Sequence, residues 1–220
     1  MTTHFESGRR AWLGQLGALA LVASGCKRTG VDEDPLDPHE FADPAAAMRW
    51  MREEEKLARD VYLTLSERFP GVHQFTNIAR SEQRHMDAMR GLLAGADEAD
   101  PVEDDAVGAF HEPQLGALFE ALVAAGERSE VDALRVGAEL EELDIADLDR
   151  ALVGNPDPSA QSVYALLRQG SCNHLNAFTR GLAQRGHEYA PQHLERAAYE
   201  AALARATNGR GHGRGHGHGG

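Results

Sequence analysis

Cysteine, aromatic residues and positive charge are all scarce in this chain of 220 residues. It has two cysteines, aromatic residues make up 6% of the sequence, and the formal net charge is −13. Proteins that bind nucleic acid need a basic stripe for the phosphate backbone, and the middle of this chain has none. We therefore expect no nucleic-acid partner.

A long apolar run is missing too. The run from Ala11 to Val22 is shorter than the ~20 residues that span a bilayer. It follows Arg9 and Arg10 and leads through small residues into Cys26, which is the layout of an export signal and its cleavage site. The five residues that end at Cys26 resemble a lipoprotein lipobox, and the sequence around the two arginines resembles a twin-arginine signal.

Residues 1–26 are therefore expected to be a signal peptide. It would direct the protein to the bacterial cell envelope or periplasm, as a lipoprotein anchored in the membrane through Cys26. A plain secretory signal with an incidental cysteine is the alternative. With lipid on Cys26, Cys172 is the only thiol left, so no disulfide can form within the chain.

The rest of the chain has the composition of a helical protein, with alanine, leucine and glutamate prominent. Four long helices are predicted from apolar periodicity and from start and stop signals, at about 44–68, 75–94, 129–152 and 158–185. A smaller helix at 113–125 lies in the roughly thirty residues between the second and the third, and short, long and short connections are typical of a four-helix bundle with one crossover.

The sequence thus predicts an all-α fold, with the bundle at 43–186 and the short extra helix in the long crossover between helices 2 and 3. A flexible tether at 27–42 precedes the bundle. An accessory segment at 187–207 follows, and then a tail at 208–220 that is rich in glycine, histidine and arginine.

Charged residues interrupt the apolar faces of the predicted helices. They are Glu82 and His85 in the second helix, Glu141 with its neighbours Glu142 and Asp144 in the third, and His174 in the fourth. Because an ionised carboxylate inside a bundle needs a partner or a metal, these positions are candidate ligands. Taken singly, His174 can be a core histidine, and Glu141 can pair with an arginine such as Arg84 or Arg135.

The first helix carries three consecutive acids, Glu53, Glu54 and Glu55. Either of the last two can lean inward. All three can also be solvated acids that pair with Lys56 and Arg59 at helical spacing.

These residues form a pattern that resembles a known superfamily. Glu55-Lys-Leu-Ala-Arg-Asp-Val-Tyr62, followed by Glu82-Gln-Arg-His85, is similar to the first half of rubrerythrin-like and other ferritin-like proteins. Segments 54–60, 81–86, 141–148 and 173–178 are similar to an uncharacterised prokaryotic ferritin-like family, a domain of unknown function, over about 47–184. The resemblance implies a ferritin-like four-helix bundle with a metal site at its centre and no established reaction.

The metal ligands implied are Glu55, Glu82, His85, Glu141 and His174, and the match selects Glu55 over Glu54. One carboxylate is missing, because the second Glu-x-x-His motif of ferritin-like sites appears here as Ser171-x-x-His174. Asp144 or Glu142 can replace it, or the site can hold one metal instead of two. The resemblance also places Tyr62 close to the ligands.

Carboxylate and imidazole ligands together suit iron best, with manganese or zinc as alternatives. The leading hypothesis is an exported metal-binding protein with a di-iron or dimanganese carboxylate site that acts on oxygen, peroxide or Fe(II). It would be an oxidoreductase of the peroxidase or ferroxidase type. The sequence has no cysteine pairs of the rubredoxin type, so electrons would come from an external donor.

Two other functions fit the sequence. One is metal binding or storage without catalysis, in which the tail histidines His212, His216 and His218 capture metal for the core. The other is a helical interaction module that binds no metal. Ferritin-like domains often pair, so the resemblance is also compatible with a homodimer.

Overall fold

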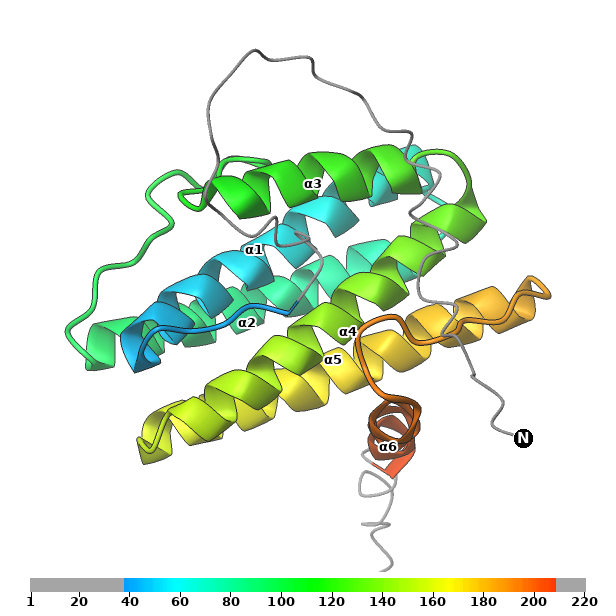
Figure 1. Ribbon diagram of the computed structural model, residues 1–220. Helices are drawn as coiled ribbons and strands as arrows, with labels where there is room; N and C mark the ends of the chain where they lie inside the picture. Colours follow the sequence, from blue (N-terminus) through cyan, green and yellow to red (C-terminus); the bar gives the residue numbers. More distant parts are fainter. Residues whose placement is uncertain (1–37, 209–220) are drawn as a thin grey trace, which may run out of the picture. The chain divides into compact units, whose positions relative to one another are not determined.

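The computed structural model describes residues 38–208, which contain six α-helices and no strand (Figure 1). The all-α prediction is therefore confirmed. The helices are α1 (Pro44–Arg68), α2 (His73–Gly95), α3 (Pro113–Gly126), α4 (Glu130–Gly154), α5 (Pro158–Gln184) and α6 (Arg196–Asn208). In this part of the chain, no helix is both long and apolar enough to cross a membrane. The signal peptide, the lipid site at Cys26 and the histidine-rich tail lie outside the described residues and stay predictions.

Three of the long helices begin at the side-chain caps that the sequence indicates. Asp43 accepts a hydrogen bond from the N–H of Ala46, and the Ser129 hydroxyl accepts one from the N–H of Asp132. Asp157 accepts two, from the first turn of α5. Each cap satisfies N–H groups that have no partner within the helix, which stabilises it by about 1 kcal/mol. The bounds of α1 agree with the prediction, whereas α2 begins two residues before the predicted Phe75.

The long helices pack as two antiparallel pairs, α1 with α2 and α4 with α5 (Figure 1). Contacts of α1 with α4 and of α2 with α5 close the bundle, α3 packs on α1 and α4, and α6 packs on α5. One end of the core is aliphatic, around Met51, Met89 and Leu148, and the other contains the packed rings of Tyr62 and Phe178. The polar residues predicted as ligands lie on the helices between these two clusters.

The outward face of α1 is charged but it is not exposed, because the crossover at 96–112 covers it. Lys56 Nζ donates to the carbonyl oxygen of Ala106 at 2.7 Å. The Asp60 carboxylate accepts from the N–H of Gly108 at 3.0 Å. Both Lys56 and Arg59 form ion pairs with Asp60, at 2.6 and 2.8 Å. These two bases are therefore not the partners of the preceding glutamates.

The interpretation of Glu53, Glu54 and Glu55 as solvated acids is wrong. Each of the three side chains is 1% exposed. Glu53 holds the crossover, since its two oxygens accept from the N–H groups of His111 and Glu112 at 2.6 and 3.0 Å. Glu54 and Glu55 point into the bundle.

The segment after α5 is tied to the outside of α4 through Glu142. One oxygen of this carboxylate accepts from the Tyr189 hydroxyl and from the N–H of Gln192 at 2.9 Å, and the other accepts from the N–H of Leu194 at 3.2 Å. This segment leads into α6, a helix that the sequence did not predict. Glu142 is thus fully engaged away from the centre of the bundle.

Residues 38–42, at the end of the predicted tether, also pack against the bundle. The N–H of His39 donates to Asp147 Oδ1 at 2.7 Å, and the His39 ring stacks on Trp50 with a centroid separation of 3.7 Å. Phe41 packs on the aliphatic end of the core.

Candidate metal centre

All five residues predicted as ligands meet at the middle of the bundle. They fall into two groups of three, in each of which one possible ligand atom per residue lies within 4.8 Å of the others. The groups are Glu55, Glu82 and His85, and Glu82, Glu141 and His174. Glu82 belongs to both. All five side chains are buried, and the most exposed of them are His85 and His174, at 7% and 8% exposure.

The two oxygens of Glu82 face different histidines. Oε2 lies 2.7 Å from His85 Nδ1, and Oε1 lies 2.7 Å from His174 Nδ1. Glu55 completes the first group at 3.1 Å from His85 Nδ1, and Glu141 completes the second at 3.4 Å from His174 Nδ1. Two atoms that bind one ion at about 2.1 Å and near right angles are about 3 Å apart. The spacing within each group is therefore compatible with a bound ion.

Several of these atoms have no hydrogen-bond partner within residues 38–208. They are Glu55 Oε1, Glu82 Oε1 and His174 Nδ1. The short contact between His174 Nδ1 and Glu82 Oε1 is thus not aligned as a hydrogen bond. Buried polar atoms are nearly always paired, and atoms that converge without pairing are what a metal site requires. The residues present therefore fit a metal ion.

The carboxylates at the centre favour the protonated form of both histidines. Burial would lower the pKa of His85, but Glu55 and Glu82 outweigh it and raise the pKa to about 11. Burial is likewise outweighed by Glu82 and Glu141 at His174, whose pKa rises to about 10. Burial raises the pKa of Glu55 to about 7, against the effect of His85. A bound cation would displace the histidine protons, because metal ligands must be deprotonated.

Asp144 lies where the sequence pattern lacks a carboxylate. The hydroxyl of Ser171 forms a hydrogen bond with Asp144 Oδ2, and Asp144 Oδ1 has no partner in the described part of the chain. Burial and then the charges of Glu55 and Glu141 raise the pKa of Asp144. Asp144 belongs to neither of the two groups of converging ligand atoms. Of the two replacements considered from the sequence, Asp144 interacts with the charges of the centre, whereas Glu142 is bonded by the segment before α6.

Two further residues shape the centre. The Tyr62 hydroxyl donates to Glu141 Oε1 at 2.7 Å, which fixes the orientation of that carboxylate. Gly170 of α5 faces the His85 ring so closely that an added Cβ would lie 2.5 Å from Cε1 and from Nε2. Sequence reasoning missed Gly170, although a glycine inside a predicted helix is a signal of close packing.

The arginine alternative for Glu141 is wrong. Arg135 instead lies 3.7 Å from Asp132, and Arg84 donates to the carbonyl oxygen of Arg80 at 2.9 Å. Glu141 accepts a hydrogen bond from Tyr62 and faces His174.

The fold and the site together define a helical-bundle protein in which buried carboxylate and histidine side chains could hold metal ions. The chain belongs to the family described as "Uncharacterized protein domain (DUF2202)", whose model matches residues 44–206. This confirms the predicted membership of a family of unknown function. The match also includes α6.

A relative and a solved structure agree with this assignment. The uncharacterized protein MJ0754 of Methanocaldococcus jannaschii is 46% identical over 157 residues, which are 71% of this chain and 84% of the relative. The crystal structure of hypothetical protein MJ0754 from Methanococcus jannaschii DSM 2661 is similar with a TM-score of 0.71 and 41% identity. The similarity covers 82% of this chain and 98% of that one.

Proposed function

We propose that this protein is a ferritin-like metal-binding protein with a di-iron carboxylate site that acts on oxygen, peroxide or Fe(II). The observation that carries the proposal is the position of Glu82, whose two oxygens each lie 2.7 Å from a different buried histidine. Bundles with dinuclear sites use carboxylates and Glu-x-x-His pairs from four helices in this way.

Each residue has a distinct role in the proposed site. Glu55 and His85 would hold one ion and Glu141 and His174 the other, and Glu82, which belongs to both groups, could contribute to both. Asp144 would supply the carboxylate that Ser171 does not, since the Ser171 hydroxyl forms a hydrogen bond with Asp144 Oδ2.

The ligand set favours iron. Mixed carboxylate and imidazole donors suit iron and manganese, and zinc is the alternative that the same donors allow. When bound, a pair of iron ions supplies reversible electron transfer to a small oxidant. The chain's own contribution is to hold the ligands, to keep the centre at most 8% exposed, and to orient Glu141 through Tyr62.

Metal content measured by mass spectrometry tests the proposal. The full chain is used with His212, His216 and His218 replaced by alanine, so that the tail contributes no metal. After loading with Fe(II) without oxygen we expect about two ions per chain, the number that a dinuclear site holds. Glu82→Gln should lose both ions, because Glu82 belongs to both groups of ligands.

Glu53→Gln is the matched control, since Glu53 is an equally buried acid on α1 that bonds only to the crossover. It should keep both ions. A folded chain that binds no iron would refute the proposal and favour the metal-free interaction module. Many iron atoms per chain would indicate storage, whereas repeated consumption of oxygen or peroxide by about two ions would indicate the oxidoreductase.

A further inference from the structure

The two histidines of the candidate centre reach closer to solvent than its carboxylates do. His85 and His174 are 7% and 8% exposed, against 1–2% for Glu55, Glu82 and Glu141. His85 Nδ1 faces Glu55 and Glu82, and His174 Nδ1 is buried beside Glu82. Because the Nδ1 edge of each ring is turned inward, the exposed part of each ring is the opposite edge.

The outer edge of the His85 ring lies against α5. Its Cε1 and Nε2 atoms are turned toward Gly170, where an added Cβ would lie 2.5 Å from each of them. Further along the seam between α2 and α5, an added Cβ at Gly181 would lie 3.0 Å from Gln74 Nε2. Residue numbers therefore rise along α5 as they fall along α2, and the two contacts are equally spaced on both helices. The two helices are antiparallel in a defined register.

Small residues line this α2–α5 seam. In the antiparallel register, Ser81 of α2 lies level with His174 of α5. Each histidine therefore has a small residue opposite it on the other helix. Helical spacing adds two alanines at the same seam, each three residues after a histidine. The four small residues are all partly buried, so they lie between the surface and the rings: Ser81, Ala88, Gly170 and Ala177.

Further segments of the chain cover the other three long helices. The crossover is bonded to α1 through Glu53 and Asp60, and α3 packs on α1 and α4. The segment before α6 is bonded to α4 through Glu142, and α6 packs on α5. By contrast, α2 presents a row of exposed charged side chains to water: Arg80, Arg84, Asp87 and Arg90. Within residues 38–208, the side of the centre nearest to water is therefore the side that α2 borders.

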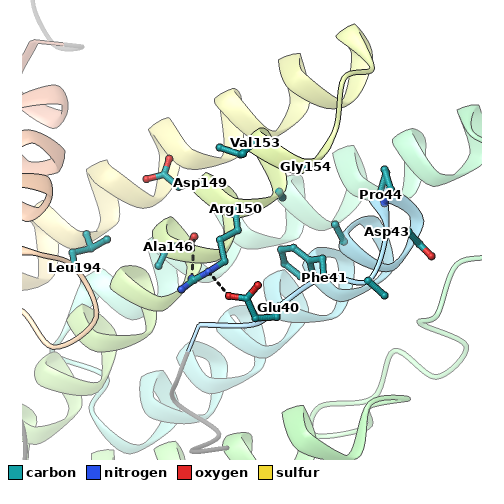
Figure 2. Close-up of a pocket in the computed structure, with 13 residues that line it drawn as sticks. Glu40, Phe41, Asp43, Pro44, Ala146, Asp149, Arg150, Val153, Gly154 and Leu194 are labelled. Carbon is teal, nitrogen blue, oxygen red and sulfur yellow. Dashed lines mark hydrogen bonds and ion pairs between the residues drawn. The ribbon is translucent and has the colours of Figure 1, made fainter.

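A surface pocket of about 720 Å³ lies elsewhere, beside the aliphatic end of the core. Ala47 and Arg150 line it, and Arg150 points toward Glu40 (Figure 2). None of the five proposed ligands is among the described residues that line this pocket. The pocket therefore does not open onto the centre.

We propose that metal ions and small oxidants reach the dinuclear centre through the α2–α5 seam, past Ser81 and Ala177. This inference rests on the function proposed above, and it identifies the residues that control which reactants reach that site. Small side chains leave the outer edges of both histidine rings within reach of water, whereas larger ones would cover them. Because every ligand is at most 8% exposed, the route suits a single ion or a small oxidant and excludes a bulky substrate.

Variants that fill the seam test the route. Ser81→Leu and Ala177→Leu add bulk on opposite sides of it without changing a ligand, and circular dichroism verifies that they fold. The full chain with the three tail histidines replaced by alanine is loaded with Co²⁺, which oxygen and imidazole ligands also bind. Absorbance of the bound ion follows loading in a stopped-flow instrument, and then its removal by excess EDTA.

Each variant should slow both loading and removal at least about fivefold and leave the equilibrium affinity within about twofold, because a residue on the route affects passage equally in both directions. Ala165→Leu is the matched control, since Ala165 is an exposed residue of α5 that does not face α2. It should leave both rates unchanged.

The outcomes separate this inference from the proposed function. If the double variant Ser81→Leu/Ala177→Leu binds Co²⁺ with unchanged rates, the route is refuted and the proposed function stands. If the variants weaken the affinity and load at the rate of the parent, these positions shape the ligands, and the route is again refuted. If the parent chain binds neither Co²⁺ nor Fe(II), the proposed function fails and the route fails with it.

Discussion

Replacing Gly170 with alanine tests how closely the bundle positions His85. The added Cβ would lie 2.5 Å from two atoms of the His85 ring, and an ordinary carbon contact is about 3.5 Å or more, so the ring must move by about 1 Å. Overpacking of this kind costs about 1–3 kcal/mol in the free energy of unfolding. Alanine also favours a helix over glycine by roughly 0.5–1 kcal/mol, which partly offsets the loss.

Gly91→Ala is the matched control, because Gly91 lies inside α2 and an added Cβ there meets nothing within 4 Å. It should gain only the stabilisation that alanine gives a helix relative to glycine, roughly 0.5–1 kcal/mol. Urea denaturation of the metal-free proteins should therefore place Gly170→Ala about 1–3 kcal/mol below Gly91→Ala. Iron titration should show at least about tenfold weaker binding for Gly170→Ala, since ligand positions tolerate only about 0.2 Å of error. If both variants are equally stabilised and bind iron like the parent chain, our account of the His85 position is refuted.

Three further changes have expected outcomes. Tyr62→Phe removes the hydrogen bond to the buried Glu141 carboxylate and should lower the free energy of unfolding by about 1–3 kcal/mol in urea denaturation; no change would contradict that bond. Without metal, unfolding at pH 8 should need less urea than at pH 5. The raised pKa of Glu55 stabilises the folded protein at low pH, and this stabilisation is lost as the pH rises through about 7, which lowers the free energy of unfolding by roughly 3 kcal/mol. The raised pKa of His85 acts in the same direction, because its stabilisation is complete only below about 6.5. Equal stability at the two pH values would refute these shifts. Glu142→Ala should speed hydrogen exchange in 187–206 and leave iron content unchanged; a loss of iron would make Glu142 a ligand.

The candidate centre was predictable from the sequence because its signal is local. Glu82 and His85 are three residues apart on one helix face, and Glu141 and His174 interrupt apolar stripes that a period of 3.6 residues predicts. The caps at Asp43, Ser129 and Asp157 act within three residues, so helix starts followed in the same way. The meeting of these side chains at one point then required only that the helices form a bundle.

Partners that are distant in the chain could not be predicted. Glu53 looked like a solvated acid because its hydrogen-bond partners are backbone N–H groups of a crossover some sixty residues further on. The sequence gives no sign of which backbone groups a distant side chain will contact. The same holds for Glu142, which looked like a candidate ligand beside Glu141 and is instead bonded by the backbone of the segment before α6. The sequence indicated that Glu142 could need a partner, but it did not indicate that Glu53 is buried.

The number of acids inside the bundle weighs against the metal-free interaction module. Within residues 38–208, six acids are buried in the bundle: Glu54, Glu55, Glu82, Glu141, Asp144 and Asp147. The cations that form ion pairs with them are His85, His174 and, for Asp147, Arg150. Without an ion, burial raises the pKa of Glu54, Glu141 and Asp144, which favours the protonated form of these acids. Apolar residues of similar size would stabilise such a core more than buried acids do. An interior of this kind is unfavourable for a bundle that only packs against a partner, and it suits one that binds cations.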